Sequence, residues 1–302
     1  MGINSETAAF LCEARRGGLS FNQVLTLGRQ NLNADKATLD ALARRNGIDP
    51  EAAVSSFGDY AEEFFGTFLG AERVDSIDQS EYEGATLVHD LNAPIPPEWE
   101  QRYDAIVDGG TLEHIFNFPV ALANCMRMLR TGGRLFICTP ANNQLGHGFY
   151  QFSPELFFRT LSREHGFEVE RMFAVQFRYS GTEYGSMKGH YRVTDPAAVG
   201  SRITLVNSRP VTLLVQACKR EHRAQPFATF PQQSDYSQAW KVGDANAIAP
   251  PRRLLEGSLL RRPVQLVKSL LPPRVGLRLR NEFDHYFVHS FRNKAFYTRV
   301  DE

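Results

Sequence analysis

The chain has 302 residues, 42% of them apolar, and its 34 lysine and arginine residues balance its 34 aspartate and glutamate residues. A zero net charge argues against the broad basic surface by which proteins hold nucleic acid, so no nucleic-acid partner is expected. No run of eighteen apolar residues is present and the first residues lack a signal-peptide pattern, which favours a cytoplasmic protein without a membrane-spanning helix.

Short apolar runs separated by helical patterns predict an α/β fold. The runs are 24–27, 74–77, 85–88, 105–107 and 134–139, and the helices expected are 34–45, 60–69, 118–129 and 154–164. The runs are three to six residues long and mostly aliphatic, as strands buried on both faces are. Strands that alternate with helices form a doubly wound, mainly parallel sheet, and such sheets bind ligands at the carboxyl ends of their strands.

The second half of the chain is less regular. Strand-like runs at 167–173 and 211–218 are separated by a long polar segment, 176–209, which we expect to be a lid because insertions of this size are often functional. It contains the ring-bearing residues Tyr179, Tyr184, His190 and Tyr191. We expect one domain over residues 1–220, followed by a linker and a basic, aromatic extension over residues 221–302.

The extension contains a segment, 252–271, in which leucines and valines lie among arginines. Such a segment could lie on an anionic membrane surface, although Pro263 would interrupt a continuous helix. The alternative is an arm that packs on its own domain or on a second subunit of a homo-oligomer. We favour the second interpretation, because apolar residues among basic ones are common at subunit contacts.

The strand ends resemble those of the class I S-adenosylmethionine-dependent methyltransferases. Residues 103–115 (YDAIVDGGTLEHI) resemble the fourth-strand motif of that family, and residues 129–135 (LRTGGRL) resemble the entry into its fifth strand. The resemblance covers roughly residues 23–219. It implies a Rossmann-like fold, S-adenosylmethionine as cofactor, and methyl transfer as the activity.

Two acidic residues at strand ends are candidate cofactor contacts. Asp78 follows the second strand, where a carboxylate can accept both hydroxyls of a ribose. The alternative is that Asp78 caps the following turn. Asp90, followed by Leu91, resembles the family residues that contact the adenine, and the alternative is an Asx-turn before Pro94.

The methionine end of the cofactor would be lined by Asp108, Gly109 and Thr111, where glycine allows a close approach of the backbone. The first strand departs from the family, because Gly28 is the only glycine where a glycine-rich turn is usual. Arg29 could pair with the methionine carboxylate instead, or it could fill the pocket.

The acceptor side is predicted from histidines and a polar loop. His114 ends the fourth-strand motif, and His147 and Tyr150 lie in the run 142–151, which is dense in hydrogen-bonding side chains. A histidine in a loop is more often structural than catalytic. The predicted reaction is methyl transfer to a small or medium polar acceptor, such as a sugar or glycan precursor. Two alternatives are a methyltransferase-like scaffold without activity and a nucleotide-binding domain of another kind.

The four cysteines are expected to be buried thiols. They are Cys12, Cys125, Cys138 and Cys218. They lie far apart, and none forms a pair, or a group with histidines, at the spacing of a zinc site. The sequence therefore predicts no metal site.

Overall fold

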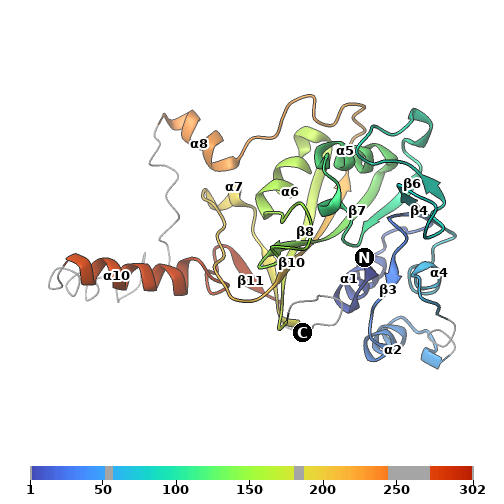
Figure 1. The fold of residues 1–302 in the computed structure, drawn as a ribbon, viewed down its shortest axis with the longest axis horizontal. Helices are drawn as coiled ribbons and strands as arrows, with labels where there is room; N and C mark the ends of the chain where they lie inside the picture. Colours follow the sequence, from blue (N-terminus) through green and yellow to red (C-terminus); the bar gives the residue numbers. More distant parts are fainter. Residues whose placement is uncertain (1, 52–56, 180–186, 244–272, 301–302) are drawn as a thin grey trace.

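A nine-stranded sheet forms the centre of the protein (Figure 1). The computed structural model describes residues 2–51, 57–179, 187–243 and 273–300. Five strands at one side of the sheet are parallel and follow the order β5, β4, β2, β6, β7. Their bounds are Leu87–Val88 (β5), Arg73–Asp78 (β4), Gln23–Leu27 (β2), Tyr103–Asp108 (β6) and Leu129–Asn142 (β7).

The strand order reverses at β2. From β2 the chain runs outward through β4 to β5, and then returns to the other side of β2 to form β6 and β7. In a doubly wound sheet this reversal opens a crevice beyond the carboxyl ends of the strands, which is where such sheets bind ligands. The Rossmann-like, mainly parallel sheet expected from the sequence is confirmed.

The other four strands extend the sheet in antiparallel fashion. Strand β10 lies between β7 and β8, and β9 and β11 follow β8. Their bounds are Val211–Lys219 (β10), Phe167–Phe177 (β8), Met187–Val193 (β9) and Tyr297–Arg299 (β11). Through β11 the C-terminal end of the described chain therefore returns to the sheet.

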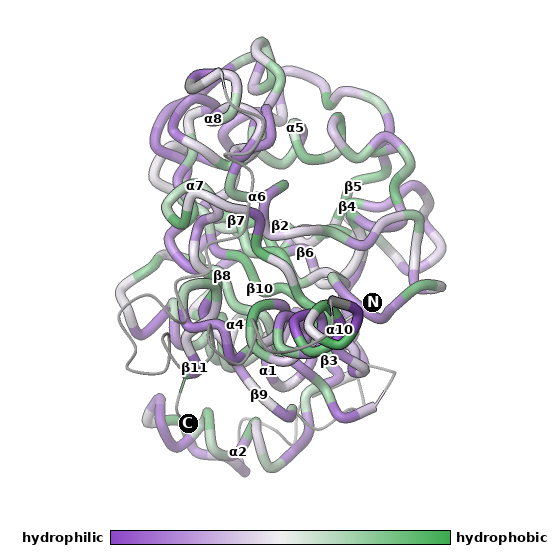
Figure 2. Tube along the Cα trace, turned by 90° about the vertical axis from the view of Figure 1, so that its left-hand side faces the viewer, coloured by the Kyte–Doolittle hydropathy of each residue, from purple (hydrophilic) through white to green (hydrophobic). Residues whose placement is uncertain are grey.

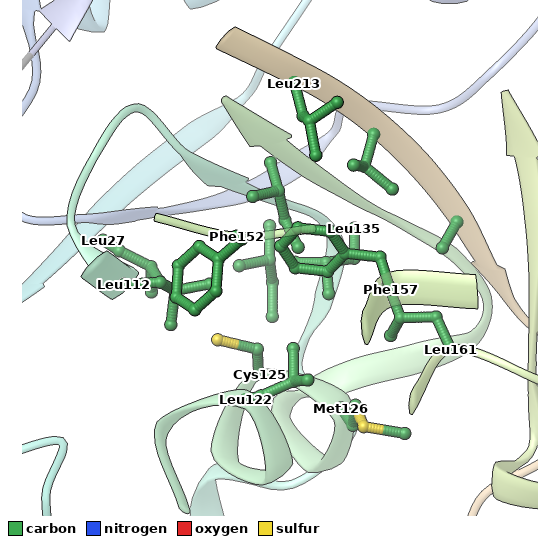
Figure 3. Packing of buried hydrophobic residues seen from close by; sticks show 14 of the residues in the cluster. Leu27, Leu112, Leu122, Cys125, Met126, Leu135, Phe152, Phe157, Leu161 and Leu213 are labelled. Atoms are coloured by element: carbon green, nitrogen blue, oxygen red, sulfur yellow. The ribbon is translucent and has the colours of Figure 1, made fainter. Parts of the chain in front are cut away.

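Helices cover both faces of the sheet because the strands are apolar on both faces. One face packs against α1 (Ser5–Arg16), α2 (Lys36–Arg45) and α4 (Glu62–Leu69), and the other packs against α5 (Phe118–Met128) and α6 (Pro154–Thr160). Figure 3 shows the second of these cores, where Phe152, Phe157 and Leu135 meet Leu122 and Cys125 of α5. All four cysteines are buried free thiols, as expected.

Shorter elements connect this framework. They are the parallel pair β1 (Gly2–Ile3) and β3 (Asn31–Leu32), α7 (Pro196–Val199), α8 (Ser234–Val242), α10 (Pro273–Phe283), the 3-10 turns Pro97–Trp99, Leu112–His114 and Arg163–His165, and the π-helical turn Asp284–Val288. Helix α10 extends away from the sheet and is seen nearly end-on in Figure 2. None of the helices in the described part of the chain has the length and apolarity needed to cross a bilayer.

Part of the segment expected to be a lid belongs to the sheet. Residues 187–193 form β9, which pairs with β8. His190 packs against the ring of Phe173, and Tyr191 stacks on Phe291 with ring centroids 4.0 Å apart. Pairing with β8 satisfies the backbone of this segment, so these side chains are held at the sheet and not over a cavity. Tyr184 and the basic segment 252–271 lie outside the described residues.

Lys219, at the end of β10, is a buried cation. Its side chain is 1% exposed, and Nζ donates hydrogen bonds to the carbonyl oxygens of Leu129 (2.6 Å) and Arg127 (3.4 Å). Because burial disfavours the charged amine, it lowers the pKa of Lys219 from 10.5 to about 8.

We expect Lys219 to make the stability of the protein depend on pH. Between about pH 8 and pH 10.5 the unfolded chain keeps a proton on Lys219 that the folded chain has lost, so this residue favours the folded state more as the pH rises. The difference in unfolding free energy between the protein and a Lys219→Met variant should change by at most about 3 kcal/mol over this window. Urea unfolding of both proteins at pH 7, 9 and 10.5 measures it, and parallel pH profiles would contradict the assignment.

Candidate functional site

Two adjoining cavities lie at the carboxyl edge of the parallel strands, and they share His114. The first has a volume of about 300 Å³ and is lined by Gly28, Ile77, Asp78, Gln79, His89, Asp90, Leu91, Asn92, Thr111, His114 and Ile115. The second has a volume of about 320 Å³ and is lined by Gly2, Asn4, Asn31, Asn33, Gly109, Gly110, Glu113, His114, Cys138, Thr139, Pro140, Gln144, His147 and Thr212. A further cavity of about 690 Å³ lies beside α2, and its ionisable lining residues within the described chain are Lys36 and Glu51.

The first cavity brings together the two acidic residues predicted as cofactor contacts. Asp78 ends β4, and its Oδ1 accepts a hydrogen bond from the Gln79 amide at 2.6 Å. Asp90 accepts hydrogen bonds through Oδ1 from the amide (2.9 Å) and the side chain (2.8 Å) of Asn92, which is the Asx-turn given as the alternative. These hydrogen bonds lower the pKa of Asp90 and keep it ionised. Leu91, 6% exposed, supplies an apolar wall to the same cavity.

In the loop after β2, Gly28 lines a cavity and Arg29 does not. Gly28 has a φ of +68°, which suits glycine, and it lines the first cavity. The Arg29 guanidinium lies 2.6 Å from Glu62 and over the ring of Tyr60, and it also donates to the carbonyl of Glu83 at 3.0 Å. Arg29 is therefore engaged on the outer side of the loop and lines neither cavity.

Gln30 is the residue that fills the space beside this loop, and the sequence analysis did not single it out. Its side chain is 2% exposed, and Nε2 donates hydrogen bonds to the carbonyls of Leu27 and Gly28. A Cβ on Gly109 would lie 2.2 Å from Gln30 Oε1. The glycine at position 109 therefore leaves room for the Gln30 side chain in this structure.

The end of β6 carries two carboxyl groups that are fully buried. Asp108 Oδ1 accepts hydrogen bonds from the amides of Thr111 (2.7 Å) and Leu112 (3.4 Å), so this side chain shapes the turn and lines neither cavity. Burial, together with the nearby charge of Glu113, raises the pKa of Asp108. Thr111 lines the first cavity and donates its hydroxyl to the carbonyl of Leu27 at 2.6 Å.

Glu113 brings the two predicted acceptor-side histidines into one group. Its Oε2 accepts a hydrogen bond from the Thr139 hydroxyl at 3.0 Å, and its Oε1 lies 3.4 Å from His147 Nε2. The rings of His114 and His147 have centroids 5.4 Å apart. Glu113 stands within the motif quoted for the fourth strand, but its sequence position gave no sign that it would meet His147.

The loop that carries His147 is held on the segment after β6. Tyr150 donates its amide to the carbonyl of Glu113 at 3.2 Å and its hydroxyl to the carbonyl of Phe116 at 2.6 Å. A Cβ on Gly148 would lie 2.8 Å from the same Glu113 carbonyl, so a glycine permits this close approach. Tyr150 lines neither cavity, and its contacts position the loop.

Comparisons with known proteins concern the fold. No protein-family model matches the chain, and no curated protein sequence matches it. A candidate methyltransferase structure from Bacillus halodurans is 12% identical, with 71% of this chain and 99% of that chain covered and a TM-score of 0.36. An S-adenosylmethionine-dependent methyltransferase from Thermotoga maritima is 14% identical, with 70% and 88% covered and a TM-score of 0.36. The 1,6-didemethyltoxoflavin-N1-methyltransferase of Burkholderia thailandensis is 17% identical, with 72% and 78% covered and a TM-score of 0.36.

The strand order of this chain is what establishes its fold. Five parallel strands reverse their order at β2, and the antiparallel β10 is inserted between β7 and β8. This is the Rossmann-like, class I methyltransferase-like fold expected from the sequence motifs.

Proposed function

We propose that the chain transfers a methyl group from S-adenosylmethionine to a small polar acceptor. The observation that carries the proposal is the pair of adjoining cavities at the switch point of the sheet. One contains two carboxylates at strand ends, and the other contains a carboxylate beside two histidines. Ligands bind to doubly wound sheets at this edge.

The residues of the first cavity fit the nucleoside part of the cofactor. Asp78 ends β4 next to the cavity, and a carboxylate there would accept the ribose hydroxyls. Asp90 is kept ionised by its hydrogen bonds and would accept the adenine amino group. Leu91 and Ile115 would pack on the faces of the base. The methionine part would extend toward Gly110 in the second cavity.

The second cavity has the groups that a hydroxyl acceptor requires. The cofactor, when bound, supplies a methyl group already activated by the sulfonium. His147 would remove the proton from the acceptor hydroxyl while the oxygen bonds to the methyl carbon, and Glu113, 3.4 Å away, would orient and stabilise the protonated imidazole. The electrons of the broken carbon–sulfur bond stay on sulfur.

The acceptor is proposed to be a sugar or glycan precursor. Amide side chains of Asn31, Asn33 and Gln144 line the second cavity beside the two histidines. Amides both donate and accept hydrogen bonds, so they suit an acceptor with several hydroxyl groups.

A second candidate function is ligand binding or scaffolding without methyl transfer. The observation that favours it is the first loop, where Gln30 fills the space beside Gly109 and Arg29 is engaged with Glu62. If Gln30 keeps this position, the methionine part of the cofactor has less room beside the loop.

Calorimetric titration with S-adenosylmethionine and S-adenosylhomocysteine tests the proposal. We expect micromolar binding of both, weakened at least about tenfold by Asp78→Ala because a charge-assisted hydrogen bond is lost. The matched control is Asp40→Ala on α2, which removes a carboxylate that pairs with Lys36 of the same helix. Absence of binding at millimolar ligand would overturn methyl transfer and leave the scaffolding function.

A further inference from the structure

The second cavity holds a group of side chains with the composition of a metal site. Glu113, His114 and His147 each offer one ligand atom, and these three atoms all lie within 4.8 Å of one another. Two imidazoles and one carboxylate are the donor set of many zinc and non-haem iron sites.

The closest pair in this group has the spacing of two ligands on one metal. Glu113 Oε1 and His147 Nε2 are 3.4 Å apart. Two ligands at about 2.0–2.1 Å from a tetrahedral zinc ion are about 3.3–3.4 Å from each other. The ligand atom of His114 lies within 4.8 Å of those of Glu113 and His147. Its side chain is exposed, so His114 would complete the site through a change of rotamer.

The buried carboxylate of the site also favours a bound cation. Glu113 is fully buried, and its Oε1 has no hydrogen-bond partner among the described residues. The same holds for Oδ2 of the neighbouring buried Asp108. Within the described ranges, the ion pairs of lysine and arginine side chains include neither carboxylate. Burying the Glu113 carboxylate without a hydrogen bond to Oε1 is costly, and a divalent ion bound between Oε1 and His147 Nε2 would compensate this carboxylate.

The carboxylate is already oriented for ligation. Thr139 donates its hydroxyl to Glu113 Oε2 at 3.0 Å, which fixes the carboxylate and leaves Oε1 directed toward His147. Hydrogen bonds of this kind to a ligating carboxylate raise the affinity of metal sites.

We propose that Glu113, His114 and His147 bind one divalent transition-metal ion of the zinc type. Three protein ligands leave a coordination position open toward the second cavity, where the hydroxyl of the acceptor would bind. Coordination lowers the pKa of a bound hydroxyl, so the metal, when bound, would replace His147 as the group that prepares the acceptor for methylation. This role for the metal rests on the proposed function, whereas binding of the metal does not.

Zinc titration of chelator-treated, full-length protein tests the site. We expect one Zn²⁺ per chain at micromolar affinity or tighter, and visible absorption bands when Co²⁺ replaces it. Affinity should fall at least about tenfold in His147→Ala and in Glu113→Gln, since each removes one of three ligands. The matched control is His285→Ala, which removes an exposed histidine of the C-terminal extension. Mg²⁺ should not compete, because imidazole is a poor ligand for it.

The possible results of these titrations test the metal site and the proposed methyl transfer separately. No saturable zinc binding, or binding that His147→Ala leaves unchanged, would overturn the metal site. Because His147 is half-exposed, its variant should keep the fold, and circular dichroism checks this. S-adenosylhomocysteine binding by the metal-free protein, measured in parallel, would stand even if zinc did not bind. Zinc binding without any binding of S-adenosylhomocysteine would support the metal site and overturn the proposed methyl transfer.

Discussion

Replacing Phe152 with alanine is expected to lower the free energy of unfolding by about 3 to 5 kcal/mol. Phe152 is 4% exposed, and its ring centroid lies 4.5 Å from that of Phe118, 5.6 Å from Tyr150 and 5.5 Å from Phe157. Removing it leaves a cavity beside the rings of Phe118, Tyr150 and Phe157. Figure 3 shows Phe152 and Phe157 within this core. Urea unfolding, monitored by circular dichroism, measures this decrease in the free energy of unfolding.

The matched control is Phe149→Ala, three residues earlier in the same loop. Phe149 is 68% exposed, and its ring makes one edge contact, with Phe116, at 6.0 Å. We expect its truncation to change the unfolding free energy by less than about 0.5 kcal/mol, as exposed substitutions usually do. Equal losses in the two variants would show that the loop is not anchored through Phe152.

Replacing Gly148 with alanine is expected to disturb the second cavity and to cost about 1 to 3 kcal/mol of stability. The added Cβ would lie 2.8 Å from the Glu113 carbonyl and 3.1 Å from His114 Nδ1. The first neighbour is backbone and yields little, so the loop should move away and carry His147 with it. Urea unfolding measures the loss of unfolding free energy. Zinc titration measures the loss of zinc affinity that a displaced His147 would cause.

Gly146→Ala gives the control for this prediction. A Cβ at Gly146 meets no atom within 4 Å, so the same chemical change two residues away should leave both stability and zinc affinity unaltered. If both glycine variants behave like the unmodified protein, the loop does not approach Glu113 as closely as the structure indicates.

The sequence contained the information for the sheet and for the edge at which the candidate site lies. Strands β2 and β6 are mainly apolar and largely buried, and helices α2 and α4 lie between β2 and β4 in the sequence. Acidic residues directly after such strands were expected to meet at one edge, and Asp78 and Asp90 line one cavity there. These are local properties, because a residue's place after a strand fixes the edge of the sheet at which it lies.

Only the tertiary structure decided which side chains meet at that edge and which turn away. Arg29 looked suited to a ligand carboxylate, yet Glu62, 33 residues later in the chain, holds it outside the cavities. Glu113 and His147 belong to loops after different strands, and they come together because β6 and β7 are neighbours in the sheet. The candidate metal ligands therefore had no recognisable spacing. Contacts between residues distant in sequence depend on strand order and loop packing, and a linear pattern of residues records neither.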